Sequence, residues 1–171
     1  MGDHEQTLSW VDRIKDRPNA RQTAERVWHR IDAMLLAQNR HTEYGTLIPA
    51  PVATARVQIH AWTVVNASPF PKEIPEAHAA AMRQRQRADL IESVAVLHAS
   101  LLLADRPTEA DQIAADLIAA MPGCEAPLGI AAKAVVHDVA DERHLKLLDA
   151  CDTPWRTEDL RRQINAAIAA R

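Results

Sequence analysis

The chain has 171 residues, a formal net charge of −3, and an ordinary balance of 47% hydrophobic and 25% charged residues. A chain of this length buries roughly 70% of its unfolded surface in one domain, so neither a metal nor a disulfide is needed to hold a core together. The mildly acidic charge excludes a global attraction to nucleic acid or to anionic lipid. Aromatic residues make up only 4%, glycine occurs four times, and alanine is abundant, which together favour closely packed helices.

The N-terminus and the two cysteines indicate a soluble cytoplasmic protein. Residues 1–6 are polar and acidic and lack the hydrophobic stretch of a signal peptide. The most apolar segment, Val94 to Ala104, is too short to span a bilayer, so no membrane role is expected. Cys124 and Cys151 do not form a framework of closely spaced pairs, and the default expectation is that both thiols are reduced.

Residues 1–67 are predicted to form an N-terminal helical segment. An apolar stripe at helical spacing, with charged residues outside it, predicts a helix over 20–38. Residues 52–67 fit both the strand period and a helical face. Helix is favoured there, because a lone strand would leave an unpaired edge and the chain offers no obvious partner strand.

Three prolines between residues 68 and 75 predict a linker, because each proline removes a backbone donor and restricts the residue before it. Residues 76–171 are predicted to form a C-terminal region of helix hairpins. Its expected helices are a long one from Pro75 to about Ala104, one capped by Thr108 that ends at Pro122, and later ones over about 127–138, 142–150 and from 154 onward. The predicted fold class is therefore all-α, a compact bundle of antiparallel helix hairpins around a long central helix, forming one domain overall.

The densest polar group lies at residues 137–144. In one continuous helix, His137, Asp141 and His144 would share a face, and two imidazoles with a carboxylate can ligate a divalent metal. The more favoured interpretation is a turn between two helices, with aspartate as a cap and the histidines in solvent. His60 and His98 lie in apolar surroundings and are expected to be core residues that donate to backbone carbonyls.

Arg83, Arg85 and Arg87 lie on the polar first half of the long helix. Arg83 and Arg87 are one turn apart and can grip a phosphate or an acidic partner, although a solvated helix face is the simpler interpretation. Residues 105–152 carry ten acidic and four basic residues, a local net charge of −6. This acidic region offers a surface on which the arginines of a second copy can dock.

No segment carries a G-x-S-x-G, Walker or dinucleotide-binding pattern, so no cofactor is expected and an enzyme is disfavoured. The leading hypothesis is a non-catalytic helical interaction or regulatory module that binds a protein partner, or itself, through Arg83, Arg85 and Arg87. One alternative is a small metal-dependent helical-bundle enzyme that uses His137, Asp141 and His144. Another is a nucleic-acid-associated accessory protein, although nucleic acid is the less favoured partner. A water-excluded cleft with convergent polar side chains would favour an enzyme.

Overall fold

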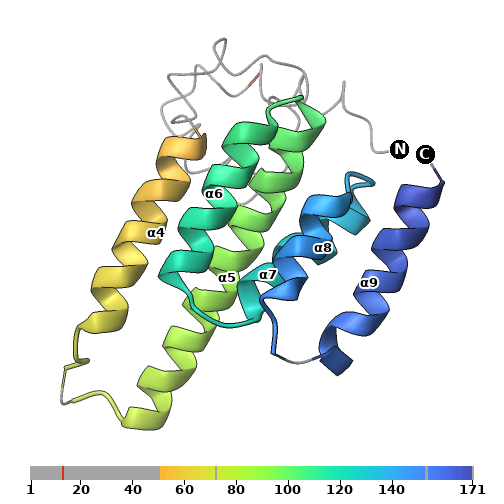
Figure 1. Cartoon of the computed structure of the whole chain (residues 1–171). Coiled ribbons are helices and arrows are strands. Elements are labelled where there is room, and N and C mark those ends of the chain that lie inside the picture. Colours follow the sequence, from red (N-terminus) through yellow and green to blue (C-terminus); the bar gives the residue numbers. More distant parts are fainter. Residues whose placement is uncertain (1–12, 14–50, 72, 153, 171) are drawn as a thin grey trace.

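The computed structural model describes residues 51–71, 73–152 and 154–170, together with Arg13. Within these ranges the protein is an all-α bundle, as predicted, with six helices and no strand (Figure 1). The helices are α4 (Pro51–Ala67), α5 (Glu76–Leu103), α6 (Pro107–Ala120), α7 (Glu125–Val136), α8 (Glu142–Asp149) and α9 (Pro154–Ala169). The preference for helix over strand at 52–67 is thus confirmed, whereas the predicted helix over 20–38 lies outside the described residues.

Proline sets the first residues of two helices. Pro75 immediately precedes α5, and Pro107 is the first residue of α6, where its fixed φ suits the helix and its missing N–H has no intrahelical partner to lose. The prediction that Thr108 caps α6 is wrong, because the helix has already begun at Pro107 and its N-cap position is Arg106.

Two helices end in the same kind of turn, each with an aspartate in the left-handed conformation. Asp105 follows α5 with φ +56°, and Asp138 follows α7 with φ +57°. The N–H of Arg106 donates to the carbonyl of Leu101 at 2.8 Å, and the corresponding bond after α7 is 2.9 Å long. These bonds define Schellman motifs, which satisfy carbonyls at the helix ends and turn the chain back toward its next hairpin partner.

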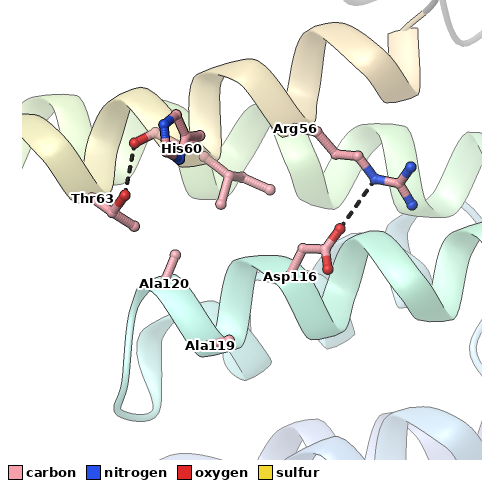
Figure 2. Close-up of a pocket in the computed structure, with 7 residues that line it drawn as sticks. Arg56, His60, Thr63, Asp116, Ala119 and Ala120 are labelled. Atoms are coloured by element: carbon pink, nitrogen blue, oxygen red, sulfur yellow. Dashed lines mark hydrogen bonds and ion pairs between the residues drawn. The ribbon is translucent and has the colours of Figure 1, made fainter.

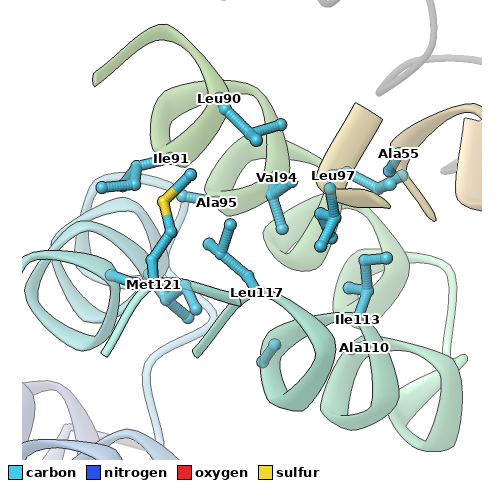
Figure 3. Packing of buried hydrophobic residues seen from close by; sticks show 14 of the residues in the cluster. Ala55, Leu90, Ile91, Val94, Ala95, Leu97, Ala110, Ile113, Leu117 and Met121 are labelled. Carbon is cyan, nitrogen blue, oxygen red and sulfur yellow. The ribbon is translucent and has the colours of Figure 1, made fainter. Parts of the chain in front are cut away.

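α5 is the central helix of the bundle, and its second half is the most deeply enclosed part. Leu90, Val94, Leu97 and Leu101 are all buried, and they pack against α4 and α6 around Ile113 (Figure 3). The predicted burial of the apolar segment after Val94 is therefore confirmed. In the described part of the chain, no helix is both long and apolar enough to cross a membrane.

α7 separates two clusters of buried side chains. The larger one joins α4, α5, α6 and the start of α7, and the smaller one joins the end of α7 to α8 and α9. α7 approaches α5 so closely that a Cβ atom at Gly129 would lie 2.5 Å from a methyl carbon of Ile91. The smaller cluster consists of Ala131, Ala134, Ala140, Leu148 and Ile164.

A disulfide joins Cys124, just before α7, to Cys151, just after α8. The bond closes the base of the α7–α8 hairpin opposite its turn. The expectation of two reduced thiols is therefore wrong. The prediction of a cytoplasmic protein rested partly on these thiols being reduced. Because disulfides are rare in cytosolic proteins, the cysteines no longer support that prediction.

Candidate functional site

Two of the three predicted partner-binding arginines make contacts within the chain. Arg83 donates to the carbonyl of Ser68 at 2.7 Å, and its guanidinium carbon lies 4.5 Å from the centre of the Phe70 ring. Arg87 Nε lies 2.8 Å from a carboxylate oxygen of Glu125, without the alignment of a hydrogen bond. Arg85 is exposed. Arg83 thus braces the α4–α5 connection, Arg87 links α5 to α7, and the three side chains do not share one exposed face.

The acidic region of residues 105–152 is partly neutralised by the chain itself. Its net charge of −6 already includes Arg106 and Arg143, and three arginines from outside the region, Arg56, Arg87 and Arg161, each pair with one of its acids. These pairs lower the negative charge that the region can offer to another molecule. The acids that take part are Glu109 (with Arg106), Asp111 and Asp141 (both with Arg143), Asp116 (with Arg56), Glu125 (with Arg87) and Asp149 (with Arg161).

His137, Asp141 and His144 straddle a turn, so they do not lie on one continuous helix. His137 is the C-cap of α7, and Asp141 is the N-cap of α8. The Asp141 carboxylate accepts from the N–H of Arg143 at 3.0 Å, and His144 Nδ1 accepts from the N–H of Asp141 at 3.0 Å. This reciprocal capping box confirms the predicted role of aspartate as a cap.

Whether His137, Asp141 and His144 bind a metal stays a prediction. Among the described residues, no group of three or more His, Cys, Asp or Glu side chains is placed to hold a metal ion. His144 is fully buried, so the expectation of solvated histidines is wrong at this position. Burial, with a further contribution from Lys133, lowers the pKa of His137.

His98 of α5 and His144 of α8 form a buried pair. The two rings meet edge to face, with centroids 5.3 Å apart and an interplanar angle of 89°. Both residues are fully buried, and within the described part of the chain neither nitrogen of His98 nor Nε2 of His144 has a hydrogen-bond partner. The prediction that His98 is a core residue is confirmed, but no backbone carbonyl of the described residues is the expected acceptor. His60, predicted to be buried, is exposed.

The two buried rings are held in the neutral state. Desolvation is the main cause that lowers the pKa of His98 from 6.5 to about 3, and the neighbouring His144 and Arg143 add to it. Desolvation also lowers the pKa of His144, against the opposing effect of Asp141. Nδ1 of His144 lies 3.0 Å from the Asp141 N–H, from which it accepts in one neutral tautomer, and 3.1 Å from the Asp141 carboxylate, to which it donates in the other.

An open groove of about 480 Å³ runs between α4 and α6 (Figure 2). Ile59, Ala119 and Ala120 contribute apolar lining, and His60 and Thr63 lie along the α4 side. Arg56 and Asp116 face each other across it with an Nε–Oδ2 distance of 3.2 Å. Since its two charged groups neutralise each other and the Thr63 hydroxyl donates to the carbonyl of His60, the groove has no set of free polar groups converging on one point.

The outer face of α4 is apolar, although it is exposed. Val57, Val64 and Val65 are 68%, 54% and 42% exposed, and Ala61 lies between them on the same face at helical spacing. The opposite face of α4 carries the buried Ile59 and Trp62.

α4 therefore has two apolar stripes, and only the inner one is buried. Figure 1 shows α4 at one edge of the bundle, next to α6. Sequence reasoning missed the outer stripe because residues 52–67 were compared only with the strand period and with a single helical face. Once the segment is taken as a helix, the spacing of 57, 61 and 64 is the signal that identifies a second stripe.

No known protein family, curated protein or solved structure matches this chain.

Proposed function

We propose that the protein is a non-catalytic helical interaction module that associates with a second copy of itself through the outer face of α4. The observation that carries the proposal is the exposed stripe formed by Val57, Ala61, Val64 and Val65, which has no charged side chain on it. The largest contiguous apolar patch on the surface of a protein is often an interaction site. The other large exposed hydrophobic side chains of the described residues are scattered over three other helices, at Met82 and Leu103 of α5, Val136 of α7 and Trp155 of α9.

A second copy is the favoured occupant because the stripe is complementary to itself. In a two-fold symmetric contact, the same patch meets itself, and residue i of one copy faces residue j of the other. Two antiparallel α4 helices place Val57 of each copy against Val64 of the other, with the small side chain of Ala61 allowing close approach. The nearest charged side chain on α4, Arg56, is already paired with Asp116, so no like charges meet across the axis.

The polar side chains of residues 51–71, 73–152 and 154–170 are not arranged around a common site, which also supports an interaction module over an enzyme. The buried histidines are sealed from solvent, and the groove between α4 and α6 offers only a paired arginine and aspartate. A contact one helix wide falls at the small end of specific interfaces, below about 1,200 Å². We therefore expect a weak dimer whose population depends on protein concentration.

Sedimentation of the purified chain over a wide concentration range tests the proposal. The wild type is expected to shift from monomer to dimer, and Val57→Asp or Val64→Asp should abolish the shift, because a buried unpaired carboxylate is costly. Val136→Asp is the matched control, since Val136 is a similarly exposed valine, at 73%, at the end of a different helix. A protein that stays monomeric at every concentration, or a dimer that both α4 variants leave intact, overturns the proposal.

The effect of salt on association distinguishes a contact through α4 from a contact through the three arginines predicted from sequence. An apolar contact keeps or gains strength at high ionic strength, whereas docking of Arg83, Arg85 and Arg87 on an acidic region would weaken. A dimer that dissociates in salt and is lost when these three arginines become alanine would contradict the role of α4 and support the arginine hypothesis. The metal-enzyme alternative is checked by elemental analysis of the same sample, which should show near-stoichiometric metal only if His137, Asp141 and His144 ligate an ion.

A further inference from the structure

The buried histidine pair lies where the two clusters of the core meet. His98 belongs to the second half of α5, which lines the larger cluster, and His144 belongs to α8, whose Leu148 is part of the smaller cluster. Three ring nitrogens of the pair have no hydrogen-bond partner among the residues that the structure describes. Buried polar groups are nearly always satisfied, so a concentration of unsatisfied nitrogens at one seam calls for a physical role.

We propose that His98 and His144 form a pH-operated latch, which holds α8 and α9 on the rest of the bundle while both rings are neutral and releases them in acid. The proposal is independent of the outer face of α4.

The surroundings of the pair disfavour a positive charge on it. Each ring is the other's neighbour, so protonating both brings two like charges together in a dry interior. Arg143 adds a third positive charge, which Asp141 and Asp111 partly offset through ion pairs of 2.9 and 3.1 Å. The carboxylate of Asp141, 3.1 Å from His144 Nδ1, is the group that favours protonation of that ring.

Charged groups on the other packed elements are engaged with one another. Lys133 of α7 is ion-paired with Glu92 of α5, and His137 lies beside that pair. On α9, Arg161 is paired with Asp149 of α8. None of these pairs supplies a free carboxylate to stabilise a cation at the two rings.

Protonation of His144 also changes the bonds at the start of α8. Nδ1 lies 3.0 Å from the Asp141 N–H and 3.1 Å from the Asp141 carboxylate oxygen Oδ1. A protonated ring has no lone pair at Nδ1, so it can only donate to the carboxylate, and the Asp141 N–H loses its acceptor in the capping box of this eight-residue helix. The proton therefore introduces charge between α5 and α8 and rearranges the N-terminus of α8.

The opening is expected to be local because α8 and α9 rest on the smaller core. Elements with few buried side chains open at lower free energy than the central helices. The Cys124–Cys151 disulfide holds the end of α8 beside the start of α7 while the segment is open. This tether keeps the released helices close, so that they can dock again when the pH is restored.

The pKa of His98 sets the expected size of the effect. With a value of about 3 in the closed state and 6.5 when the ring is exposed, titration of His98 alone should raise the open population about 30-fold between pH 7.5 and pH 5, and His144, whose pKa burial also lowers, adds to this rise. The sign follows because the open state binds the proton more readily, so acid shifts the equilibrium toward it.

Native-state hydrogen exchange, expressed as protection factors at pH 7.5 and pH 5, tests the latch in the full chain. In the wild type, protection of the α8 and α9 amides should fall by more than about 30-fold, while the second half of α5 stays protected. His98→Leu and His144→Gln should each reduce this fall, and the double variant should remove it. The glutamine at 144 can still accept from the Asp141 N–H, so the capping box survives without a titrating ring.

His78→Gln is the matched control, because His78 is an exposed histidine on the first half of α5. It should behave as the wild type does. If His98→Leu does not fold, His144→Gln alone decides, since its acid response must be smaller than that of the wild type. An equal fall in the wild type and in the folded variants, or a parallel loss of protection throughout α4, α5 and α6, overturns the latch.

Discussion

Reduction of the Cys124–Cys151 disulfide should destabilise the protein. The size of the effect depends on the number of residues in the loop that the disulfide closes. The two cysteines are 27 residues apart in sequence. Closing a loop of this size removes conformational entropy from the unfolded chain that is worth about 3.5 kcal/mol at 25 °C. For a protein of this length, that loss corresponds to a fall in Tm of roughly 10 °C.

Urea unfolding with and without a phosphine reductant measures the difference directly. Thiol titration of the denatured protein should find no free thiol before reduction and two after it. A variant with Cys124→Ala and Cys151→Ala is the control, because its stability should match that of the reduced wild type and should not respond to reductant. Two free thiols in the protein as purified, or equal unfolding midpoints with and without reductant, would refute the reasoning.

Three further predictions concern the core. Leu101→Ala should lower the free energy of unfolding by about 2–5 kcal/mol in urea melts, because Leu101 is fully buried in the central helix, and a loss below about 0.5 kcal/mol would contradict its central place. Gly129→Ala should lower the free energy of unfolding by about 1–3 kcal/mol, because the new Cβ would collide with Ile91 and this outweighs the better helix propensity of alanine. A stabilised variant would show that α5 and α7 can move apart at no cost. Titration of His98 alone should lower the free energy of unfolding by about 2 kcal/mol from pH 7.5 to pH 5, because its pKa is lower in the folded protein than in the unfolded chain. In urea melts, His98→Leu should remove that part of the pH dependence.

The sequence by itself determined the helical class and most of the helix positions in the described region. Prolines at 75, 107 and 154 lie at or just before the starts of helices, since proline fits a first turn and breaks an interior. The all-round apolar character of Val94 to Ala104 identified the most buried part of the central helix. These features are local, and each residue type acts within one or two turns of its own position.

The tertiary structure alone decided which side chains meet. His98 and His144 are 46 positions apart, and no spacing rule connects them, so their contact depends on how α8 docks against α5. Arg83 and Arg87, which were predicted to bind a partner, instead contact the α4–α5 connection and α7. Their long side chains can reach acceptors that helix packing brings close. The disulfide likewise required the α7–α8 hairpin to bring two distant cysteines together. Local sequence sets where helices begin and end, whereas the packing of whole helices against each other selects these long-range pairs.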